Sequence, residues 1–405
     1  MRLLLILSLF IALLSAGCGG GSSSKSGDKD SNNAPEISGT PVTFLKSGNA
    51  YTFTPSAYDA DNDELVFSIS NKPDWATFDT ATGTLSGTPT KGFYRNIIIS
   101  VSDGIDTTSL QAFQIAAPEL LLLKTGQTGC WNAYGTSVSC SGTNQDGDTL
   151  SGADPDFTAN LTSNTVTDNV NGILWANEAS PIAQNYSTAS YLCENSTLGS
   201  SLWKLPDITE LEMIVNYGTV SAPYLFSTFN NYASDNYWTS KTEYGNVSYL
   251  WMISFASGLQ TVDVSNASHY YRCVDRTSRS TQGIFSRDSS NGIVYDARTG
   301  LEWADRPLSS MTWTAALDYC GSMTYGGYSD WRTPNIRELN SISHKAAASP
   351  AFSTAFSYPA SAYFWSSTTY EGDYATSWTV DFSTGAAKTI SKTGSNYVKC
   401  VRGGE

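Results

Sequence analysis

The sequence predicts a β-sandwich followed by two copies of one mixed α+β module. Charged residues make up only 15% of the 405 residues, and a set of tryptophan, proline and cysteine motifs occurs twice. A low charge content with many glycine and aromatic residues favours short strands and turns over long surface helices. A chain of this length has room for several separate cores.

The N-terminus has the features of an exported protein. Arg2 precedes an apolar run from Leu3 to Leu14, which is too short to span a bilayer but suits a signal peptide. Small residues then lead to Cys18, which resembles a bacterial lipobox. Residues 1–18 are therefore predicted to be a lipoprotein signal peptide with Cys18 as the lipidation site; an ordinary cleaved signal is the alternative. Residues 19–34 are rich in Gly, Ser, Asn and Asp, a composition typical of a flexible tether.

Residues 35–117 have the pattern of a sandwich. Ile97, Ile99 and Val101 alternate with residues of the opposite face, and glycine-containing turns recur along the segment. Three motifs are more specific than this pattern: Pro73-Asp74-Trp75, Thr82-Gly83-Thr84-Leu85-Ser86-Gly87-Thr88-Pro89 and Val101-Ser102-Asp103-Gly104. They resemble the Ig-like, cadherin-like domain family of bacterial surface proteins, and this resemblance implies a spacer.

Residues 119–278 and 283–405 are copies of each other. The matched motifs are Gly172-Ile173-Leu174-Trp175 with Gly300-Leu301-Glu302-Trp303, Trp203-Lys204-Leu205-Pro206 with Trp331-Arg332-Thr333-Pro334, and Tyr237-Trp238-Thr239-Ser240 with Phe364-Trp365-Ser366-Ser367. Trp251 and Trp378 also match. Matched tryptophans at strand and helix periodicity are predicted to lie in the core rather than to form sugar-stacking platforms.

The repetition also selects a disulfide pairing. Six cysteines remain after Cys18, and six cysteines allow 15 pairings. Two copies of one fold should contain the same bridge, so we expect Cys193–Cys273 and Cys320–Cys400, which leaves Cys130–Cys140. A bridge between the copies is the alternative.

Each copy is expected to contain two short helices followed by antiparallel strands. In the second copy, Thr312 is a candidate N-cap, and Asn335 with Glu338 forms a capping box, as Asp207 and Glu210 do in the first. Later, Trp378, Val380 and Phe382 alternate with polar residues, which predicts a half-buried strand.

The second copy resembles the Lcl C-terminal domain family, named after a collagen-like bacterial adhesin. The resemblance rests on Thr299-Gly300-Leu301-Glu302-Trp303, Ala316-Leu317-Asp318-Tyr319-Cys320, Gly326-Gly327-Tyr328-Ser329-Asp330-Trp331-Arg332-Thr333-Pro334 and Cys400-Val401-Arg402-Gly403-Gly404. It implies a C-type-lectin-like fold and, for the characterised adhesin, binding of sulfated glycans. That binding depends on basic surface, which this sequence lacks, so the ligand is not carried over. The first copy departs from the motifs at Ser201-Leu202-Trp203-Lys204 and Cys273-Val274-Asp275-Arg276.

Two sets of residues are candidate binding sites. Asp59, Asp61 and Asp63 are spaced at every second residue, with Asp103 returning nearby, and such oxygen ligands suit Ca²⁺; a solvated acidic turn is the alternative. No other cofactor is expected. Tyrosines in irregular stretches where the copies differ are candidate ligand contacts, because tyrosine gives a rigid, amphipathic surface: Tyr363, Tyr370, Tyr374, Tyr244 and Tyr249.

Other classes of function are excluded or disfavoured. The net charge of −14 argues against nucleic acid as a partner. The two histidines, His269 and His344, lie at unmatched positions, so no catalytic triad is shared by the copies, and we expect no enzyme. The sequence therefore predicts a binding or adhesion lipoprotein, anchored by its lipid in the outer membrane, with a glycan or protein ligand. An envelope structural or assembly protein that binds other subunits is the alternative.

Overall fold

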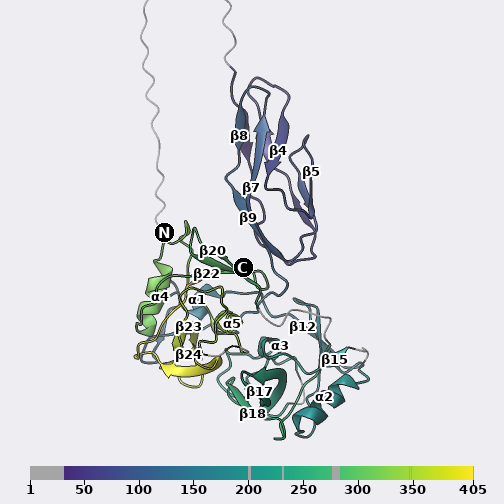
Figure 1. The fold of residues 1–405 in the computed structure, drawn as a ribbon, viewed down its shortest axis with the longest axis vertical. Coiled ribbons are helices and arrows are strands. Elements are labelled where there is room, and N and C mark those ends of the chain that lie inside the picture. Colours follow the sequence, from purple (N-terminus) through teal and green to yellow (C-terminus); the bar gives the residue numbers. More distant parts are fainter. Residues whose placement is uncertain are drawn as a thin grey trace, which may run out of the picture.

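The computed structural model describes residues 32–198, 202–229, 232–275, 283–345, 347 and 349–404. The predicted signal peptide, Cys18 and nearly all of the predicted tether lie outside the described residues. Among the helices of the described part, none is both long and apolar enough to cross a membrane. The strands of the first domain occupy one end of the molecule, and the two repeats lie side by side at the other (Figure 1).

The first domain is a small sandwich of antiparallel strands. Its core lies between the sheets and contains Phe53, Phe67, Leu85, Ile97 and Ile99. Strand β2 pairs with β6, which pairs with β5, while β7 pairs with β4, β8 and β9. The strands are β1 (Glu36–Ser38), β2 (Tyr51–Phe53), β3 (Ser56–Tyr58), β4 (Val66–Ser70), β5 (Ala76–Phe78), β6 (Leu85–Gly87), β7 (Gly92–Ser102), β8 (Thr107–Ser109) and β9 (Phe113–Ala117).

The two repeats have the same order of elements, except that the first has the short strand β15 (Trp203–Lys204) between its two helices. The first contains β12 (Phe157–Asn160), β13 (Thr165–Asp168), β14 (Ile173–Ala176), α2 (Tyr186–Glu194), β15 (Trp203–Lys204), α3 (Ile208–Met213), β16 (Asn236–Glu243), β17 (Asn246–Ser254), β18 (Gln260–Val264) and β19 (Val274–Asp275). The second contains β20 (Phe285–Asp288), β21 (Ile293–Asp296), β22 (Leu301–Ala304), α4 (Trp313–Gly321), α5 (Ile336–Ser341), β23 (Tyr363–Thr369), β24 (Thr376–Asp381), β25 (Ala386–Ser391) and β26 (Val401–Gly403).

Each repeat has two small antiparallel sheets. In the second repeat, the last strand β26 returns to pair with β22, and β23, β24 and β25 form a separate sheet. The structure contains the disulfides Cys193–Cys273 and Cys320–Cys400, each of which joins the first helix of a repeat to the residue before its last strand. The predicted capping boxes are present at Asp207 and Asn335. Thr312 is the N-cap of α4, but its side chain makes no capping hydrogen bond.

Strand β24 and the second half of β17 (residues 250–253) are buried on both faces, so the prediction of a half-buried strand is wrong. Thr379 is 0% exposed and Asp381 is 9% exposed, against 0% for both Trp378 and Val380. One face of β24 packs against the helix α5, and the other lies on the same side as Trp365, in the cluster beneath α4 and its disulfide. The polar side chains use hydrogen bonds within the sheet; the Thr379 hydroxyl donates to the Lys388 carbonyl at 3.1 Å. Polar alternation therefore did not mark a solvent-facing side.

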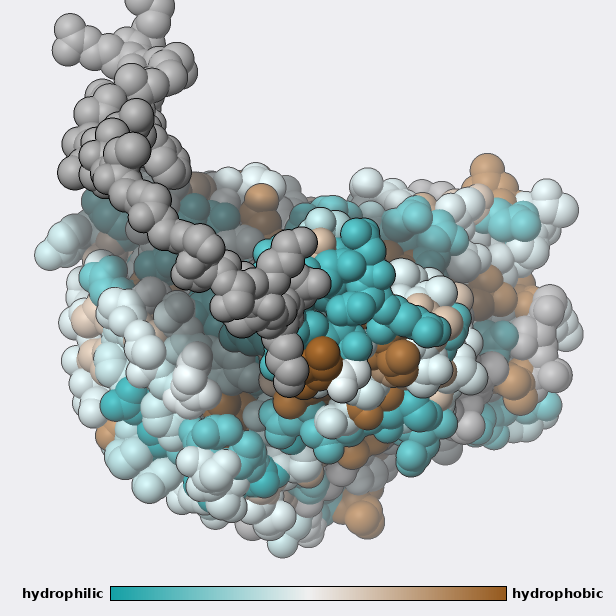
Figure 2. Space-filling view, turned by 90° about the horizontal axis from the view of Figure 1, so that it is seen from above, coloured by the Kyte–Doolittle hydropathy of each residue, from teal (hydrophilic) through white to brown (hydrophobic). Residues whose placement is uncertain are grey.

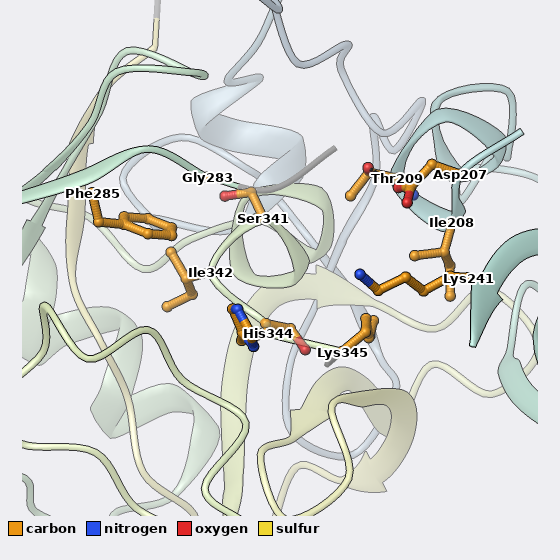
Figure 3. A pocket seen from close by; sticks show the side chains of 11 residues that line it. Asp207, Ile208, Thr209, Lys241, Gly283, Phe285, Ser341, Ile342, His344 and Lys345 are labelled. Carbon is orange, nitrogen blue, oxygen red and sulfur yellow. Dashed lines mark hydrogen bonds between the residues drawn. The ribbon is translucent and has the colours of Figure 1, made fainter. Parts of the chain in front are cut away.

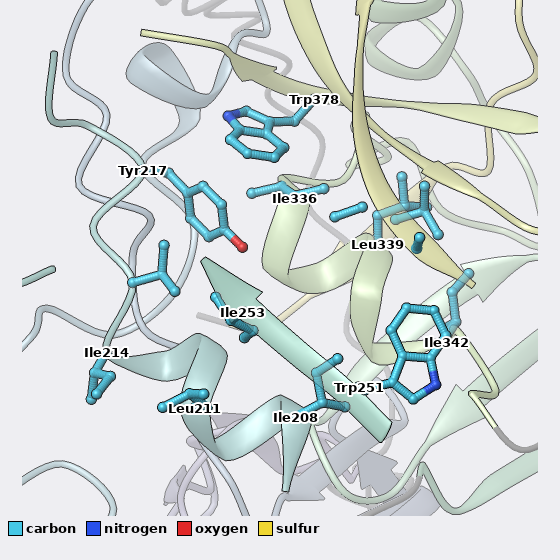
Figure 4. Close-up of a cluster of buried hydrophobic side chains, with 14 of the residues drawn as sticks. Ile208, Leu211, Ile214, Tyr217, Trp251, Ile253, Ile336, Leu339, Ile342 and Trp378 are labelled. Carbon is cyan, nitrogen blue, oxygen red and sulfur yellow. The ribbon is translucent and has the colours of Figure 1, made fainter. Parts of the chain in front are cut away.

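The two repeats share a single hydrophobic core. Helices α3 and α5 contact each other, and so do strands β18 and β25. Figure 4 shows side chains from α3 and α5 facing the same cluster as Ile253, Trp251 and Trp378. Equivalent residues meet across this core, and all of them are buried: Ile208, Leu211 and Ile214 from the first repeat, and Ile336, Leu339 and Ile342 from the second. The repeats are thus halves of one unit rather than separate modules.

The segment before β12 bridges both repeats, although the sequence assigns it to the first. It contains the hairpin β10 (Cys130–Trp131) and β11 (Ser137–Val138), closed by the disulfide Cys130–Cys140, and the helix α1 (Asp146–Thr149). Helix α1 contacts β23 of the second repeat. The Asp146 carboxylate accepts hydrogen bonds from the hydroxyls of Thr125 and Thr368, at 2.7 and 2.6 Å. The Gln127 side chain both donates to and accepts from the backbone of Thr369.

Candidate functional site

A polar cleft lies between the Ig-like domain and the second repeat. Two adjoining cavities, of about 820 and 710 Å³, share the residues Thr43, Gln114 and Arg402. The Ig-like wall comes from residues 43–44, from β7 and from residues 112–116 with β9; the opposite wall comes from β20, β21, β22, β26 and residues 328–332 of the second repeat. The lining residues are Thr43, Phe44, Arg95, Asn96, Ala112, Phe113, Gln114, Ala116, Asp288, Asn291, Tyr295, Gly300, Glu302, Tyr328, Asp330, Arg332, Arg402, Gly403 and Gly404.

Arg402 is the central residue of this cleft. Its Nε and Nη2 atoms donate to the Asp330 carboxylate at 2.8 and 3.1 Å, and its Nη1 lies 2.9 Å from the carboxylate of Glu302. The guanidinium stacks on the Tyr328 ring, 3.6 Å from the ring centre. Strand pairing places these groups together, because Glu302 on β22 lies opposite Arg402 on β26.

Glu302 also joins the two domains. The Glu302 side chain is 2% exposed, and its carboxylate accepts a hydrogen bond from the Gln114 amide of the Ig-like domain. A buried carboxylate needs such partners, since an unpaired buried charge is costly. The contact between Gln114 and Glu302 therefore links docking of the Ig-like domain to the charge arrangement of the cleft.

Arg332 is structural rather than available for a ligand. It forms a bidentate pair with Glu338, with both N···O distances at 2.7 Å, and it donates to the Gly403 carbonyl at 3.0 Å. Glu338 in turn accepts from the backbone N–H of Asn335 as part of the capping box. Arg332 thus ties the start of α5 to the last strand, and these bonds engage its guanidinium.

Arg95 contrasts with Arg332 and Arg402. Its guanidinium lies 3.1 Å from the centre of the Tyr295 ring and 5.4 Å from that of Phe93. Its buried Nε has no hydrogen-bond partner, and among the described residues no carboxylate forms an ion pair with it. A cation that is held over aromatic rings without a counterion is available to an anionic or polar ligand.

The surroundings of Asp330, Tyr328 and Tyr295 keep each of these cleft residues in one protonation state near neutral pH. Partial burial opposes ionisation of Asp330, but the hydrogen bond and charge of Arg402 outweigh it and hold the pKa of Asp330 below its ordinary value. Burial and the nearby Glu302 raise the pKa of Tyr328, and burial raises the pKa of Tyr295 to about 12. Asp330 is therefore ionised and the tyrosines are neutral at neutral pH.

The first repeat lacks this arrangement. The positions equivalent to Glu302, Asp330 and Arg402 hold Leu174, Leu202 and Asp275. Glu302, Asp330 and Arg402 belong to the motifs that carry the family resemblance, but the sequence did not predict that they form a site. The signal was present: the charged motif residues occur in only one of two otherwise matched copies. The opposite wall of the cleft could not be predicted, because Arg95 lies about two hundred positions before Tyr295 in the sequence.

None of the five predicted tyrosines lines this cleft. Tyr374 stacks on Trp131 with ring centres 4.4 Å apart, and Tyr370 packs edge-on against Trp378 at 5.4 Å, so both serve internal packing. Tyr363 and Tyr244 are 37% and 53% exposed on separate repeats, and Tyr249 is half-buried on β17. The structure does not gather these residues into one surface.

The predicted metal ligands are partly brought together. Ligand oxygens of Asp59, Asp61 and Asp63 all lie within 4.8 Å of one another. Asp59 is only 4% exposed, and its Oδ2 has no hydrogen-bond partner, while its Oδ1 accepts from the backbone N–H groups of Asp61 and Asp63. Asp103 is not part of this group. It accepts hydrogen bonds from Asn32 and from the backbone of its own turn, and these bonds lower its pKa.

Another cavity, of about 400 Å³, lies beside the junction of the repeats (Figure 3). It contains His344, whose pKa is lowered by burial and by the charge of Lys241. The hydroxyls of Ser341 and Ser343 donate to backbone carbonyls, at 2.7 and 3.0 Å, so neither donates to the histidine. His269, in the other repeat, pairs with Asp263 at 2.9 Å.

On the face seen in Figure 2, hydrophobic residues form small separate spots among hydrophilic ones.

Comparisons with known proteins agree with the domain order. The profile of the Lcl C-terminal domain matches residues 164–275 and 292–402, together more than half of the chain. The He_PIG family of Ig-like domains matches residues 34–117. No curated protein matches the chain.

Similarities to solved structures are weak. The SrpA adhesin from Streptococcus sanguinis is 13% identical, with a TM-score of 0.20, over 36% of this chain and 88% of the adhesin. Human protocadherin-24 EC1-2 is 22% identical, with a TM-score of 0.18, over 24% of this chain and 48% of that one. A structure described as a candidate α-galactosidase from Bacteroides fragilis is 17% identical, with a TM-score of 0.19, over 25% of this chain and 21% of its own length. By its two matched domains, the chain belongs to the Lcl C-terminal domain family.

Proposed function

We propose that this protein is a non-catalytic binding protein of the bacterial envelope, and that its ligand binds in the cleft between the Ig-like domain and the second repeat. The observation that carries the proposal is Arg95, a guanidinium held over Tyr295 with no counterion, facing the paired Arg402 across a polar cavity. Clefts between domains with a few convergent polar groups are common ligand sites.

The ligand class follows from the lining. Planar polar groups, from Gln114, Asn96 and Asn291, suit the hydroxyl groups of a glycan. Arg95 would pair with a single carboxylate, whereas Arg402 is already neutralised by Glu302 and Asp330. We therefore propose a glycan that contains an acidic sugar, rather than a polyanion that requires a broad basic surface.

Anchoring and fold complete the proposal. A lipid on Cys18 would hold the protein at the outer membrane, and the residues after it would act as the tether. We also propose that each repeat is a variant of the C-type-lectin-like fold. The support is the disulfide from the first helix to the end of the repeat and the pairing of its first and last strands.

A glycan array tests the function. The chain without residues 1–18 should bind glycans that contain a carboxylate, and Arg95→Met should reduce binding at least tenfold. Lys91→Met is the matched control, because Lys91 lies on the same domain, is paired with Glu119 and does not line the cleft. Absence of any glycan signal, together with a defined envelope partner in cross-linked pull-downs, would instead support an assembly protein.

We further propose that Asp59, Asp61 and Asp63 bind Ca²⁺. The support is their clustered oxygens and the buried, unpartnered Oδ2 of Asp59. Millimolar Ca²⁺ should raise the Tm of the parent protein but not that of Asp59→Asn. Asp74→Asn, at an exposed acid of the same domain, should respond like the parent. A parent Tm that does not depend on Ca²⁺ would reject the site.

A further inference from the structure

A lysine and a glutamine meet in the core that the two repeats share. Nζ of Lys345, in the second repeat, lies 2.7 Å from Oε1 of Gln260, in the first. The residues are 6% and 1% exposed. Lysine is rarely buried to this extent unless it is paired with an acid. Among the described residues, no carboxylate forms an ion pair with Lys345.

The groups around the amine hold it beside the amide. Lys345 Nζ also donates to the Gly385 carbonyl, and it lies 4.9 Å from the centre of the Trp251 ring. In the repeat pattern, Tyr217 occupies the position equivalent to Lys345, and Ala387 the one equivalent to Gln260. The pair is therefore an asymmetric feature in a core where most contacts are between similar residues.

The amide of Gln260 is arranged as an electrophile. Besides the lysine, its Oε1 accepts a hydrogen bond from the backbone N–H of Ala387 at 3.3 Å. A backbone donor at this position stabilises negative charge on the oxygen when a nucleophile adds to the carbonyl carbon. The Nε2 atom has no hydrogen-bond partner among the described residues, so no contact holds it in place.

We propose that Lys345 and Gln260 form an intramolecular isopeptide bond that joins the two repeats covalently. The neutral amine of Lys345 adds to Cδ of Gln260, and one amine proton passes to Nε2. The Cδ–Nε2 bond then breaks and ammonia leaves, while the Nζ–Cδ amide bond remains. No oxidant, reductant or other reactant is consumed.

Burial supplies the conditions that this reaction needs. Burial lowers the pKa of Lys345 to about 7, although the buried Glu212 acts in the opposite direction, so a large share of the amine is neutral at physiological pH. The fixed contact replaces a bimolecular encounter, and such effective molarities reach about 10⁵–10⁸ M in well-oriented cases. Exclusion of water from the core also disfavours hydrolysis of the amide.

Mass spectrometry of the purified, fully reduced protein tests the bond. Proteolytic digestion should release one branched peptide that contains both Lys345 and Gln260, lighter than the two separate peptides by one ammonia. The digest of the parent protein is sufficient for this test. Recovery of Lys345 and Gln260 only in separate, unmodified peptides would overturn the proposal.

Matched variants identify the nucleophile. Lys345→Arg keeps a cation at this position but should abolish the branched peptide. Lys392→Arg should retain it, because burial also lowers the pKa of Lys392 to about 7, yet Lys392 donates to the Thr369 hydroxyl at 2.8 Å rather than to an amide side chain. Persistence of the branched peptide in Lys345→Arg would also contradict the assignment. On a reducing, denaturing gel, the parent should migrate faster than Lys345→Arg, since the bond keeps a loop closed.

Discussion

The side-chain amide of Asn340 donates a hydrogen bond to the Glu212 carboxylate at 2.6 Å, and these two residues occupy the same position in the two repeats. The contact lies between α3 and α5, near the centre of the shared core. Glu212 also accepts from the Tyr217 hydroxyl at 2.9 Å. Burial raises the pKa of Glu212, although Arg337 and Asn340 oppose this effect. Equivalent surfaces that face each other are the arrangement of a symmetric dimer, here within one chain.

Truncation of the shared core should destabilise both repeats together. Leu339→Ala removes a fully buried side chain that packs between α5 and the first repeat, so we expect a loss of about 3 kcal/mol in the free energy of unfolding. Denaturant unfolding should show a single transition for the two repeats. Val247→Ala, at a position 81% exposed, is the control and should change stability by less than about 0.5 kcal/mol. Separate transitions for the repeats would contradict one common core.

Docking of the segment before β12 should depend on pH through Asp146. Burial raises the pKa of Asp146 to about 6, from an ordinary value of 3.8. The folded protein then binds a proton more tightly than the unfolded chain, so this stability is present below pH 4 and is lost as the pH rises through about 6.

The size of this effect can be measured by comparison with a neutral variant. Asp146→Asn should show no such loss, and the difference between parent and variant should change by about 2 kcal/mol between pH 4 and pH 7. Unfolding free energies of both proteins at the two pH values provide the measurement. A difference that is constant with pH would mean that the pKa of Asp146 is the same in the folded protein and in the unfolded chain.

The charge pair of the cleft should show strong coupling. Arg402→Met leaves the buried carboxylate of Glu302 without its cation, which should cost about 3–5 kcal/mol. Adding Glu302→Leu, the residue that the first repeat has at this position, should recover most of the loss. A double-mutant cycle measures this coupling. Additive losses would show that Glu302 is not dependent on Arg402.

The disulfides should differ in their contribution to stability. Cys320–Cys400 spans 80 residues and Cys130–Cys140 spans 10. In the chain-entropy model the long loop contributes roughly 4–5 kcal/mol and the short one about 2.5–3 kcal/mol. Paired Cys→Ala replacements, compared by denaturant unfolding, should preserve this order. Equal losses would indicate that native-state contacts, rather than loop length, set the contribution.

Local and repeated features could be predicted from the sequence. The capping boxes at Asn335 and Asp207 depend on residues three positions apart, so a short window contains all of the information. The disulfide pairing followed from the repetition, because two copies of one fold must contain the same bridge. The burial of the matched tryptophans followed in the same way.

Contacts between distant parts of the chain could not be predicted. The polar residues of β24 suggested a solvent-facing side, but a second cluster beneath α4 covers that face. The proposed binding cleft requires Arg95 to lie over Tyr295, and the proposed covalent bond requires Lys345 to meet Gln260. No periodicity or spacing relates these pairs, because each arises where independently folded elements pack together.

The sequence by itself determined the order of domains, the duplication, the disulfides and the residues that begin the helices, since these depend on local pattern or on comparison of the copies. The tertiary structure decided how the copies combine. Their apolar helix faces bury each other, and therefore two repeats form one core with Glu212 and Asn340 at its centre. Packing of the Ig-like domain against the second repeat likewise decided where the charged motif residues form a cleft.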